Sequence, residues 1–513
     1  MQTNGNERIF WICEVLRERR AYVLPSNDSV FEHCEWWFLL KTREFLLKGK
    51  ERIAFFRGFA IIRKNAKERL CMSGFMKAYI EAYRDVACPC GKPHRVALED
   101  VIVETGAVNR LPEVLARYGC KRVFLLADGN TDAAAGGFVR TALDAAGMAY
   151  TQYVFPESPK PDEWAVGAAL MHFDHSCDGI VGIGSGVIND IGKILSKTAK
   201  LPYIIVATAP SMDGYASATS SMDIDGLKVS LDSRVPNVIL GDIDILKNAP
   251  LHTLKSGLGD MLAKYISICE WQIAALLIGE YYCDTVAQLI CKALSKCVEN
   301  AAGLLNREEA AVQAVFEGLI IGGIAMSYAG LSRPAAGMEH YISHVWDMRG
   351  LALGTPTDTH GIQCAIGTLY CARLYEKLRT VTPDKEKALS FVESFDVEAW
   401  YKELTDFMGS GGETMVALDR KEQKYDKAKH AARLEKILEN WEAIQQMIAA
   451  LPTAEQVEAI LDAIDAPKSA EDIGLPGGIL PMTVKAAKDI RDKYVLSRLL
   501  WDLGIIDEFA EML

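Results

Sequence analysis

Residues 178–193 read Asp178-Gly-Ile-Val-Gly-Ile-Gly-Ser-Gly-Val-Ile-Asn-Asp-Ile-Gly-Lys193, and they join a short apolar run to an amphipathic one. The apolar run up to Gly184 predicts a buried strand, and residues 187–197 predict a helix. Glycines at such a turn let the backbone approach a pyrophosphate closely, and the free N–H groups of the helix favour its negative charge. The spacing is not the usual G-x-G-x-x-G, so a tight strand-to-helix turn that binds no ligand is the alternative.

Apolar runs and amphipathic stretches alternate on both sides of this turn. Residues 121–127, 149–155 and 202–207 predict further strands, and residues 131–147 and 162–173 predict helices between them. Strands separated by helices of this length indicate a Rossmann-like α/β domain, in which helices cover both faces of a parallel sheet. Sheets of this kind bind ligands beyond the carboxyl ends of their strands.

An all-helical half follows the α/β half, because strand signals stop near residue 250. The segments that predict its helices are 255–277, 285–305, 308–329, 424–451 and 483–500. We expect a dinucleotide-binding α/β domain over 75–250 and a helical domain over 251–513, with the active site in the cleft between them. Residues 1–74 are rich in Arg and aromatic residues, lack a clear period, and are expected to form an extension of unknown role.

Size and charge exclude several classes of protein. The 513 residues exceed the usual size of a single core, which favours two domains. A formal net charge of −12 argues against a nucleic-acid partner, because polyanion binding requires a basic face. No segment is expected to supply the roughly 20 uncharged apolar residues that cross a bilayer, and no signal peptide is recognised, so no membrane association is expected.

Thirteen cysteines are scattered along the chain without a repeated spacing. The odd count in a long chain indicates reduced thiols in a cytoplasmic protein rather than a disulfide framework. The tightest group is Cys88-Pro-Cys-Gly-Lys-Pro-His94, which has the residue types of a metal knuckle. No second pair of Cys or His follows at zinc-finger spacing, so the sequence favours an irregular entry into the α/β domain over a structural metal site.

Two further segments follow predicted strands at the edge where a dinucleotide would bind. The loop Thr208-Ala-Pro-Ser-Met-Asp-Gly-Tyr-Ala-Ser217 is polar and consists largely of small residues. Asp128 ends a predicted strand, where a carboxylate can accept from a ribose 2′-hydroxyl and repel a 2′-phosphate, favouring NAD over NADP. Asp at such a position is also a common helix cap, so a purely structural role for Asp128 stays open.

Three segments of the helical half carry residue types that suit a metal ion. His340 and His344 are four residues apart and share a helix face, and His360 lies in a Pro/Thr/Gly-rich connection that can aim it back at them. Asp260 is expected to begin a helix after a Gly-x-Gly turn. One carboxylate and two imidazoles leave room for substrate, and they suit Zn, Ni, Co or Fe. The alternative is a helix-capping Asp260 and histidines that make ordinary hydrogen bonds.

Several motifs resemble the glycerol-1-phosphate dehydrogenases, which belong to the iron-type alcohol dehydrogenase and dehydroquinate synthase group. The resemblance covers about 85–513, beginning with the Cys88 segment. Its other motifs are Gly184-Ser-Gly-Val-Ile-Asn-Asp190, Thr208-Ala-Pro-Ser-Met-Asp-Gly214, Gly257-Leu-Gly-Asp-Met-Leu-Ala-Lys264, Ser332-Arg-Pro-Ala-Ala-Gly-Met-Glu-His-Tyr-Ile-Ser-His344 and His360-Gly361. The Ser332 motif looks like the bacterial, nickel-associated branch. Gly184-Ser-Gly186 departs from a common Gly-Gly-Gly run without removing a ligand.

The resemblance implies a role for each motif. It implies Asp260, His340 and His360 as ligands of Ni or Zn, and Asp213 and His344 as substrate contacts, with Asp260 also near the substrate. Lys264 and Arg333 are candidates for the cation that meets a phosphate. The residues implied to line NAD(H) or NADP(H) are Asp128, Gly184, Gly186, Val187, Ile188, Asn189, Asp190, Thr208, Ala209, Pro210, Ser211 and Ser217.

The activity implied by the resemblance is the metal-dependent, NAD(P)H-linked reduction of dihydroxyacetone phosphate to sn-glycerol 1-phosphate. In that reaction His344 would hold a substrate hydroxyl or relay the alcohol proton. A cytoplasmic homo-oligomer is expected, with a dimer favoured. The alternatives are a dehydrogenase for glycerol or another alcohol, and a lyase of the dehydroquinate synthase kind.

Overall fold

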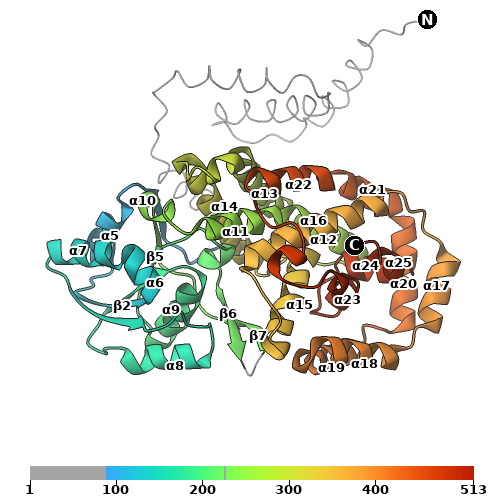
Figure 1. The fold of residues 1–513 in the computed structure, drawn as a ribbon, viewed down its shortest axis with the longest axis horizontal. Coiled ribbons are helices and arrows are strands. Elements are labelled where there is room, and N and C mark those ends of the chain that lie inside the picture. The colour runs from blue at the N-terminus through green and yellow to red at the C-terminus, as the bar shows by residue number, and fades with distance from the viewer. Residues whose placement is uncertain (1–87, 225–226) are drawn as a thin grey trace, which may run out of the picture. The chain divides into compact units, whose positions relative to one another are not determined.

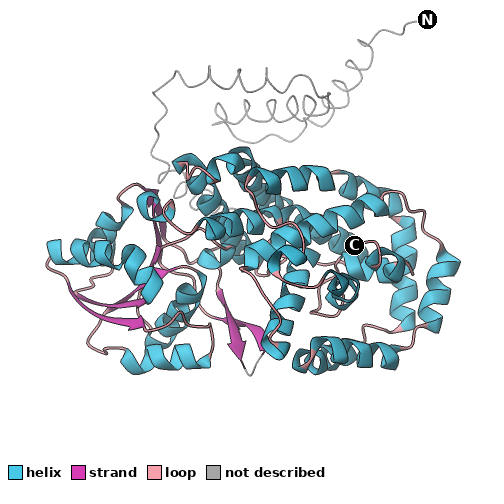
Figure 2. Ribbon diagram, viewed as in Figure 1, coloured by secondary structure: helices cyan, strands magenta, loops and turns pink. Residues whose placement is uncertain are grey.

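The computed structural model describes residues 88–224 and 227–513. The predicted extension over 1–74 lies outside the described residues. Figures 1 and 2 show an α/β half that contains the large sheet, followed along the chain by a half made of helices. The prediction of a Rossmann-like α/β region followed by an all-helical region is therefore confirmed.

Six parallel strands form the large sheet, in the order β1-β8-β5-β4-β2-β3. Their bounds are Asp100–Glu104 (β1), Arg122–Asp128 (β2), Ala149–Phe155 (β3), Gly179–Gly184 (β4), Tyr203–Ala207 (β5) and Val238–Asp242 (β8). The four predicted strands correspond to β2, β3, β4 and β5. β1 and β8 were not predicted, because only three consecutive residues are apolar in each (101–103 and 238–240) and such short runs do not separate strand from helix.

Helices cover both faces of this sheet, because alternate strand residues point to opposite sides. Val123 and Leu125 of β2 belong to one apolar core, and Phe124 and Leu126 belong to another. The first core includes residues of α5 (Leu111–Arg117) and α7 (Gly137–Ala145), and the second includes residues of α8 (Glu163–His172) and α9 (Gly186–Ala199). The strands between them are buried on both sides.

The order of the strands reverses between β2 and β4. From β2 the chain moves outward to β3, and it then returns to place β4 on the other side of β2. Parallel sheets bind ligands at such a switch point, in the crevice beyond the carboxyl ends of the strands. Asp128 ends β2 and Gly184 ends β4, so two predicted cofactor residues lie at this crevice.

A small antiparallel hairpin lies between β5 and β8 in the chain. It consists of β6 (Thr219–Ile224) and β7 (Leu227–Asp232), and it was not predicted. The short helical segments of the α/β half are η2 (Ala107–Arg110), α6 (Gly129–Thr131), η3 (Asp132–Gly136), η4 (Asp213–Ala216) and α10 (Ile243–Leu246).

Helices make up the rest of the described chain. Their bounds are Leu251–Leu262 (α11), Lys264–Ile278 (α12), Asp284–Asn300 (α13), Glu309–Ala329 (α14), Met338–Leu353 (α15), His360–Leu378 (α16), Lys385–Ser394 (α17), Val397–Met408 (α18), Ser410–Glu422 (α19), Lys427–Glu439 (α20), Trp441–Ala449 (α21), Ala454–Ala463 (α22), Leu480–Ala487 (α23), Leu496–Asp502 (α24) and Ile506–Ala510 (α25). Three predicted helices are each divided in two, over 255–277, 424–451 and 483–500. The first two breaks are single residues, Ala263 and Asn440, and the third spans residues 488–495.

Two helical segments are long and apolar enough to cross a membrane by composition alone. They span Leu251–Ile278 and Glu309–Ala329, and the sequence analysis did not single them out for this. In the fold, 72% and 78% of their most apolar windows are buried inside the protein. Residues of α11 and α14 share one hydrophobic core with Phe124 and Ile180 of the sheet. Burial against protein therefore accounts for their apolar character.

Candidate active site and metal centre

Three histidines of the helical half converge. His340 and His344 lie on α15, and His360 is the first residue of α16, directly after the connection in which it was predicted. The ring centroids of His340 and His360 are 4.9 Å apart, and His344 lies 6.4 Å from the first and 6.0 Å from the second. The shared face predicted from the four-residue spacing and the return of His360 toward it are both present.

Asp260 reaches this group from inside a helix, so its predicted position at a helix start is wrong. It does not begin a helix after a turn, since Gly257, Gly259 and Asp260 all lie inside α11. A Cβ atom on Gly257 would overlap the carbonyl oxygen of Pro210, and one on Gly259 would overlap that of Gly361. The glycines serve close packing, which draws the loop after β5 and the start of α16 against the helix that carries Asp260.

The same kind of contact joins α15 to α16. A Cβ atom on Gly361 would overlap the backbone of Ser256 in α11, and one on Gly367 would lie 2.7 Å from the carbonyl oxygen of Glu339 in α15. Glycine inside a helix costs roughly 0.5–1 kcal/mol relative to alanine. Here it allows α11, α15 and α16 to approach closely enough for their polar side chains to meet.

Asp260 also joins the predicted substrate residue Asp213. The Asp260 Oδ2 atom accepts the backbone N–H of Asp213 at 2.8 Å. Lys264 lies between the two side chains, with its Nζ atom 2.6 Å from Asp260 Oδ1 and 2.7 Å from Asp213 Oδ2. Because all three side chains are buried, the ammonium offsets the charge of two carboxylates that would otherwise repel each other. Asp213 and Asp260, which the resemblance implied as substrate contacts, are therefore neighbours.

The imidazoles of His340 and His360 are oriented by neighbouring side chains. His340 Nδ1 lies 2.9 Å from Glu339 Oε1, and His360 Nδ1 lies 3.1 Å from Ser343 Oγ. Partners on Nδ1 leave Nε2 as the nitrogen for a metal, which is how ligating histidines are commonly held. His340 Nε2 is 3.7 Å from Asp260 Oδ1. Two N/O ligands of one tetrahedral ion lie about 3.3 Å apart, so this pair is close to ligand spacing.

Cys364 is a neighbour that the sequence analysis did not assign. Its Sγ atom is 3.6 Å from His360 Nε2, and the ligand atoms of His340, His360 and Cys364 lie within 4.8 Å of one another. The signal was present, because Cys364 follows His360 by one helical turn and shares its face. Burial raises the pKa of the Cys364 thiol well above its usual value, with smaller contributions from carboxylates such as Asp260.

Burial keeps the imidazole of His340 neutral. The pKa of His340 is held well below 6.5 by desolvation first, and then by the charges of His360 and Lys264. The pKa of Asp213 is raised by desolvation and by Asp260, against the opposing effect of Lys264. Neutral imidazoles are the form that binds a metal ion. The donor set, its spacing and the neutral imidazole of His340 therefore fit a divalent transition metal.

His344 differs from the other two histidines. Its Nδ1 atom is buried and has no hydrogen-bond partner among the residues of the described chain. Its pKa lies well below 6.5, because of burial first and then because of the positive charges of Arg491, His360, Lys228 and Lys493. A buried polar atom without a partner costs free energy unless a ligand satisfies it. The position predicted to contact substrate is thus unsatisfied and surrounded by cations.

The two cations named from the sequence are both paired with other protein groups. Arg333 donates to both carboxylate oxygens of Glu280 and to the carbonyl oxygen of Tyr494. Lys264 lies in the site but is paired with Asp213 and Asp260. The cations near His344 come instead from β7 (Lys228) and from the connection between α23 and α24 (Arg491 and Lys493), which no sequence motif marked.

Asp128 acts as a helix cap at the edge of the sheet. Its Oδ1 atom accepts the backbone N–H groups of Asn130 and Thr131, and the Thr131 hydroxyl accepts the N–H of Asp128. The structural alternative raised from the sequence is therefore present. Both bonds go to Oδ1, and Oδ2 accepts no hydrogen bond from the residues that the structure describes, so the cap leaves one carboxylate oxygen for a ligand.

The glycine-rich turn forms the predicted strand-to-helix connection. Gly184 ends β4, Ser185 is the N-cap, and α9 begins at Gly186. A Cβ atom on Gly184 would lie 2.6 Å from Cβ of Ile188, so this glycine allows the helix to pack tightly after the strand. Val187 and Ile188 complete the first helical turn, whose N–H groups have no partner within the helix. The turn keeps the geometry of an anion site.

The next two residues of α9 point to protein groups. Asn189 is fully buried and donates through Nδ2 to the carbonyl oxygen of Gly214 at 3.3 Å. Asp190 pairs with Lys193 at 2.7 Å and accepts the backbone N–H of Ser221. Both side chains join α9 to the segment that follows β5. Their place in the cofactor set stays a prediction.

The loop after β5 links the two halves. Thr208 donates its backbone N–H to the carbonyl oxygen of Gly184 at 3.1 Å, and Ala209 accepts the Tyr215 hydroxyl at 2.7 Å. The other loop residues of the predicted cofactor set contact protein groups. Pro210 packs against Gly257, the Ser211 carbonyl oxygen accepts the Ser256 hydroxyl at 3.0 Å, and the Ser217 hydroxyl lies 3.0 Å from that of Thr219. This loop thus connects the edge of the sheet where the dinucleotide is predicted to bind with α11, the helix that carries Asp260.

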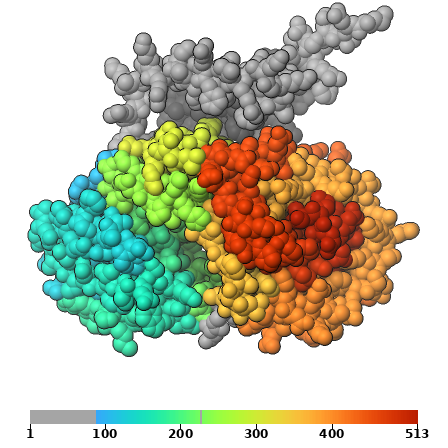
Figure 3. Space-filling view, in the orientation of Figure 1, coloured from blue at the N-terminus to red at the C-terminus, as the bar shows by residue number. Residues whose placement is uncertain are grey.

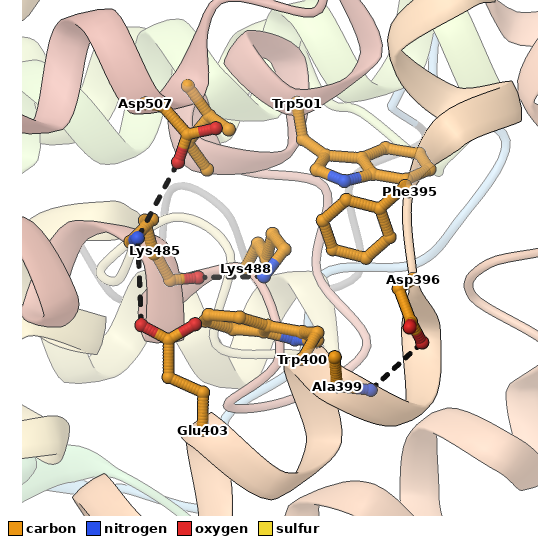
Figure 4. A pocket seen from close by; sticks show the side chains of 10 residues that line it. Phe395, Asp396, Ala399, Trp400, Glu403, Lys485, Lys488, Trp501 and Asp507 are labelled. Atoms are coloured by element: carbon orange, nitrogen blue, oxygen red, sulfur yellow. Dashed lines mark hydrogen bonds and ion pairs between the residues drawn. The ribbon is translucent and has the colours of Figure 1, made fainter.

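The surface is hollowed in more than one place. Figure 3 shows a recess between the blue-green residues of the α/β half and the orange residues of the helical half. A separate cavity of about 230 Å³ lies among the last helices, lined by residues that include Trp400, Lys488 and Trp501 (Figure 4). The Lys488 ammonium lies 3.4 Å from the centre of the Trp400 ring. None of the predicted site residues lines that cavity.

Comparisons with known proteins agree with the geometry. The model of the iron-containing alcohol dehydrogenase family matches residues 102–250. The glycerol-1-phosphate dehydrogenase of Bacillus velezensis is 31% identical over 304 residues, which are 57% of this chain and 77% of that protein. The chain belongs to the glycerol-1-phosphate dehydrogenase family. It is therefore an oxidoreductase, and the family resemblance stated from the motifs is confirmed.

Other relatives cover more of the chain. The family member of Halalkalibacterium halodurans is 27% identical over 414 residues, which are 80% of this chain and 94% of that protein. Among solved structures, the glycerol dehydrogenase of Schizosaccharomyces pombe aligns with a TM-score of 0.52 at 18% identity, covering 80% of this chain and 89% of that one. At that identity the structural likeness speaks for the fold alone.

Proposed function

We propose that this protein catalyses the reversible, NAD(P)H-linked reduction of dihydroxyacetone phosphate to sn-glycerol 1-phosphate, with one bound Ni or Zn ion. The observation that carries the proposal is the meeting of Asp260, His340 and His360, which come from three helices. The names of the relatives, glycerol-1-phosphate dehydrogenase with NAD(P)+, supply the reaction and the cofactor.

The residues that would hold the metal are Asp260, His340 and His360, with Cys364 beside them. When bound there, a divalent ion acts as a Lewis acid toward the substrate oxygen at C2. Glu339 and Ser343 hold the two imidazoles by their Nδ1 atoms, and Lys264 holds the Asp260 carboxylate. The protein thereby fixes its donors before the substrate arrives, which lowers the cost of orienting them in the reaction.

His344 is the proposed proton-handling residue. Because its pKa is well below 6.5, the imidazole is neutral at neutral pH. A neutral imidazole can accept the alcohol proton when sn-glycerol 1-phosphate is oxidised and return it in the reduction. The free Nδ1 atom gives it a position for that hydrogen bond. Asp213, next to Lys264, is the proposed partner of another substrate hydroxyl.

The dinucleotide would bind at the switch point of the sheet. The first turn of α9 would hold the pyrophosphate through its backbone N–H groups. Asp128 Oδ2 would accept from the adenosine ribose while Oδ1 keeps its cap. This arrangement favours NADH, since a carboxylate repels a 2′-phosphate.

The substrate phosphate would meet Arg491 and Lys493. Both charges act on His344, and Lys493 Nζ lies 5.9 Å from the centre of the Tyr341 ring, one turn before His344 on α15. Burial lowers the pKa of Lys493 to about 7, with Arg333 and Arg491 adding to the effect. A dianionic phosphate beside it would restore the protonated ammonium. This pair replaces Lys264 and Arg333 as the proposed phosphate cations.

The assay that tests the proposal follows NADH consumption with dihydroxyacetone phosphate, in protein loaded with Ni or Zn. We expect turnover with the phosphate ester that greatly exceeds turnover with dihydroxyacetone. The variant Arg491→Gln should raise KM for the ester and leave the rate with dihydroxyacetone unchanged, and Arg420→Gln, which removes an exposed Arg paired with Glu398, is the control.

The rival activities predict other outcomes of this assay. Faster reduction of dihydroxyacetone than of its phosphate would indicate a glycerol dehydrogenase instead. A lyase of the dehydroquinate synthase kind would oxidise no net NADH. The proposed setting is the cytoplasm, in a homo-oligomer for which a dimer is favoured, and the ten described cysteines are all free thiols, in keeping with a reducing compartment.

A further inference from the structure

A second group of metal-ligating side chains lies where the described chain begins. Cys88, Cys90 and His94 come from the segment that enters the α/β half, and Cys283 immediately precedes α13 in the helical half. One ligand atom from each lies within 4.8 Å of the other three. The sequence analysis favoured an irregular entry over a metal site because it found no second Cys or His pair, but the fourth donor is a single cysteine 189 residues after His94.

The distances in this group match the edges of one coordination tetrahedron. With Zn–S bonds of about 2.3 Å and Zn–N bonds of about 2.05 Å, tetrahedral S···S edges are about 3.8 Å and S···N edges about 3.6 Å. The Cys88 and Cys283 sulfurs are 3.6 Å apart. His94 Nε2 lies 3.6 Å from the Cys90 sulfur and 3.4 Å from that of Cys283.

Neighbouring groups orient the donors. His94 Nδ1 lies 3.2 Å from the carbonyl oxygen of Tyr328, which leaves Nε2 facing the three sulfurs. Gly91 adopts φ = 79° and donates its N–H to the carbonyl oxygen of Cys88, so the chain folds back between Cys88 and His94. The Tyr281 hydroxyl donates to the Cys90 sulfur at 3.3 Å. Outer contacts of this kind accompany protein metal ligands.

Burial separates this group from a chance surface cluster. His94 is 2% exposed and Cys283 is 1% exposed, and Cys88 and Cys90 pack against the same hydrophobic core. A site of four protein donors leaves no position for water or substrate, and such closed sites serve structure. Thiolate and imidazole donors select Zn²⁺ or a chemically similar ion over Mg²⁺ or Ca²⁺.

We propose that Cys88, Cys90, His94 and Cys283 bind one structural zinc ion, separate from the catalytic metal. The ion would connect the entry segment of the α/β half to the start of α13. It would also hold the end of α14, since His94 contacts Tyr328. Binding of the ion is then coupled to the folding of this junction.

A disulfide between Cys88 and Cys283 is the competing arrangement. A disulfide bond requires the sulfurs to approach to about 2.05 Å, and it would use two of the four donors. It leaves the orientation of His94 Nε2 toward Cys90 and Cys283 without a function. The metal accounts for all four side chains.

The test uses the full chain carrying His340→Ala, which removes a ligand of the proposed catalytic metal. Expressed with zinc, this variant should retain one zinc ion per chain by elemental analysis. Adding Cys283→Ser should abolish that zinc, and adding Cys291→Ser should not, because Cys291 is an exposed cysteine of the same helix outside both clusters. Unchanged zinc after Cys283→Ser would overturn the proposal.

Two measurements on the His340→Ala chain need no cysteine variant. After exchange with Co²⁺, the protein should show the intense thiolate-to-cobalt charge-transfer absorption of a multi-cysteine site, and its absence would contradict the assignment. A mercurial reagent should release the zinc as it blocks thiols. Titration of denatured, metal-stripped wild-type chain should find all 13 cysteines as thiols, and the loss of two would identify the disulfide. None of these measurements depends on turnover with dihydroxyacetone phosphate.

Discussion

The two candidate metal clusters of this chain differ in their donors and in what surrounds them. Cys88, Cys90, His94 and Cys283, here called the Cys88 cluster, supply three sulfurs and one imidazole, and their four ligand atoms lie within 4.8 Å of one another. The Asp260 cluster has a carboxylate and two imidazoles, and next to it lies His344, whose Nδ1 atom lacks a partner among the described residues. A closed donor set holds structure together, whereas an incomplete set beside an unsatisfied polar atom leaves a place for substrate.

The largest effect is expected from His340→Ala. Removal of a metal ligand should lower kcat/KM for dihydroxyacetone phosphate by on the order of 10³-fold, because several kcal/mol of charge stabilisation is lost. Zinc at the Cys88 cluster should remain. His172→Ala, at an exposed position of α8, is the control and should leave both kcat/KM and the bound zinc unchanged. Full turnover of the metal-free His340→Ala variant would show that the Asp260 cluster is not the catalytic centre.

Gly361→Ala should disturb the Asp260 cluster without touching a ligand. The added Cβ atom would overlap the backbone of Ser256, and overpacking of this kind costs about 1–3 kcal/mol. Both the free energy of unfolding and the affinity for the catalytic metal should fall. Gly167→Ala in α8 is the matched control, because its Cβ atom meets nothing within 4 Å and alanine favours a helix by up to about 1 kcal/mol. Equal effects of the two changes in urea unfolding would refute the role of close packing.

These glycines also show where sequence reasoning ends. The strands β2 to β5 and the faces of the long helices follow from local periodicity, and the four-residue spacing of His340 and His344 predicted their common face. Gly257 and Gly259 were assigned to a turn, because a glycine needed for a turn and one needed for helix contact look alike in sequence. The contact partners Pro210 and Gly361 are distant in the chain.

The same limit explains the residues that were missed. Cys283 is far from Cys88 in sequence, and Arg491 and Lys493 carry no motif, so only the packing of the helices brings them to their clusters. Cys364 is the exception, since its spacing from His360 was visible. Asp128 illustrates a residue with two compatible roles, for which the sequence offered the choice and the structure shows the cap.

A moderate effect is expected from acid on the metal-free protein. The pKa values of His340 and His344 lie well below 6.5 in the folded state, so the unfolded chain takes up protons first as the pH falls below 6.5. Each histidine should then lower the free energy of unfolding by up to about 1.4 kcal/mol per pH unit. His344→Gln should reduce the loss between pH 6.5 and 5.5, measured by urea unfolding in chelator. If the free energy of unfolding of His344→Gln falls with pH as steeply as that of the wild type, His344 is protonated in the fold.

The smallest effect is expected at the cofactor edge. Asp128→Ser keeps an N-cap but removes the carboxylate, so stability should change little while KM for NADH rises roughly tenfold, as for a lost charge-assisted hydrogen bond. The preference for NADH over NADPH should weaken. Asp162→Ser, at the cap of α8, removes a similar carboxylate away from the switch point. It should leave KM for NADH and the preference for NADH over NADPH unchanged. Unaltered cofactor kinetics of Asp128→Ser would limit Asp128 to its cap.

Anomalous diffraction from crystals of the active, full-length protein tests the central claim most directly. Data on both sides of the absorption edge of the bound metal should show a peak about 2.0–2.2 Å from the donor atoms of Asp260, His340 and His360. No peak among these three side chains, in crystals grown from protein with full turnover, would contradict the account.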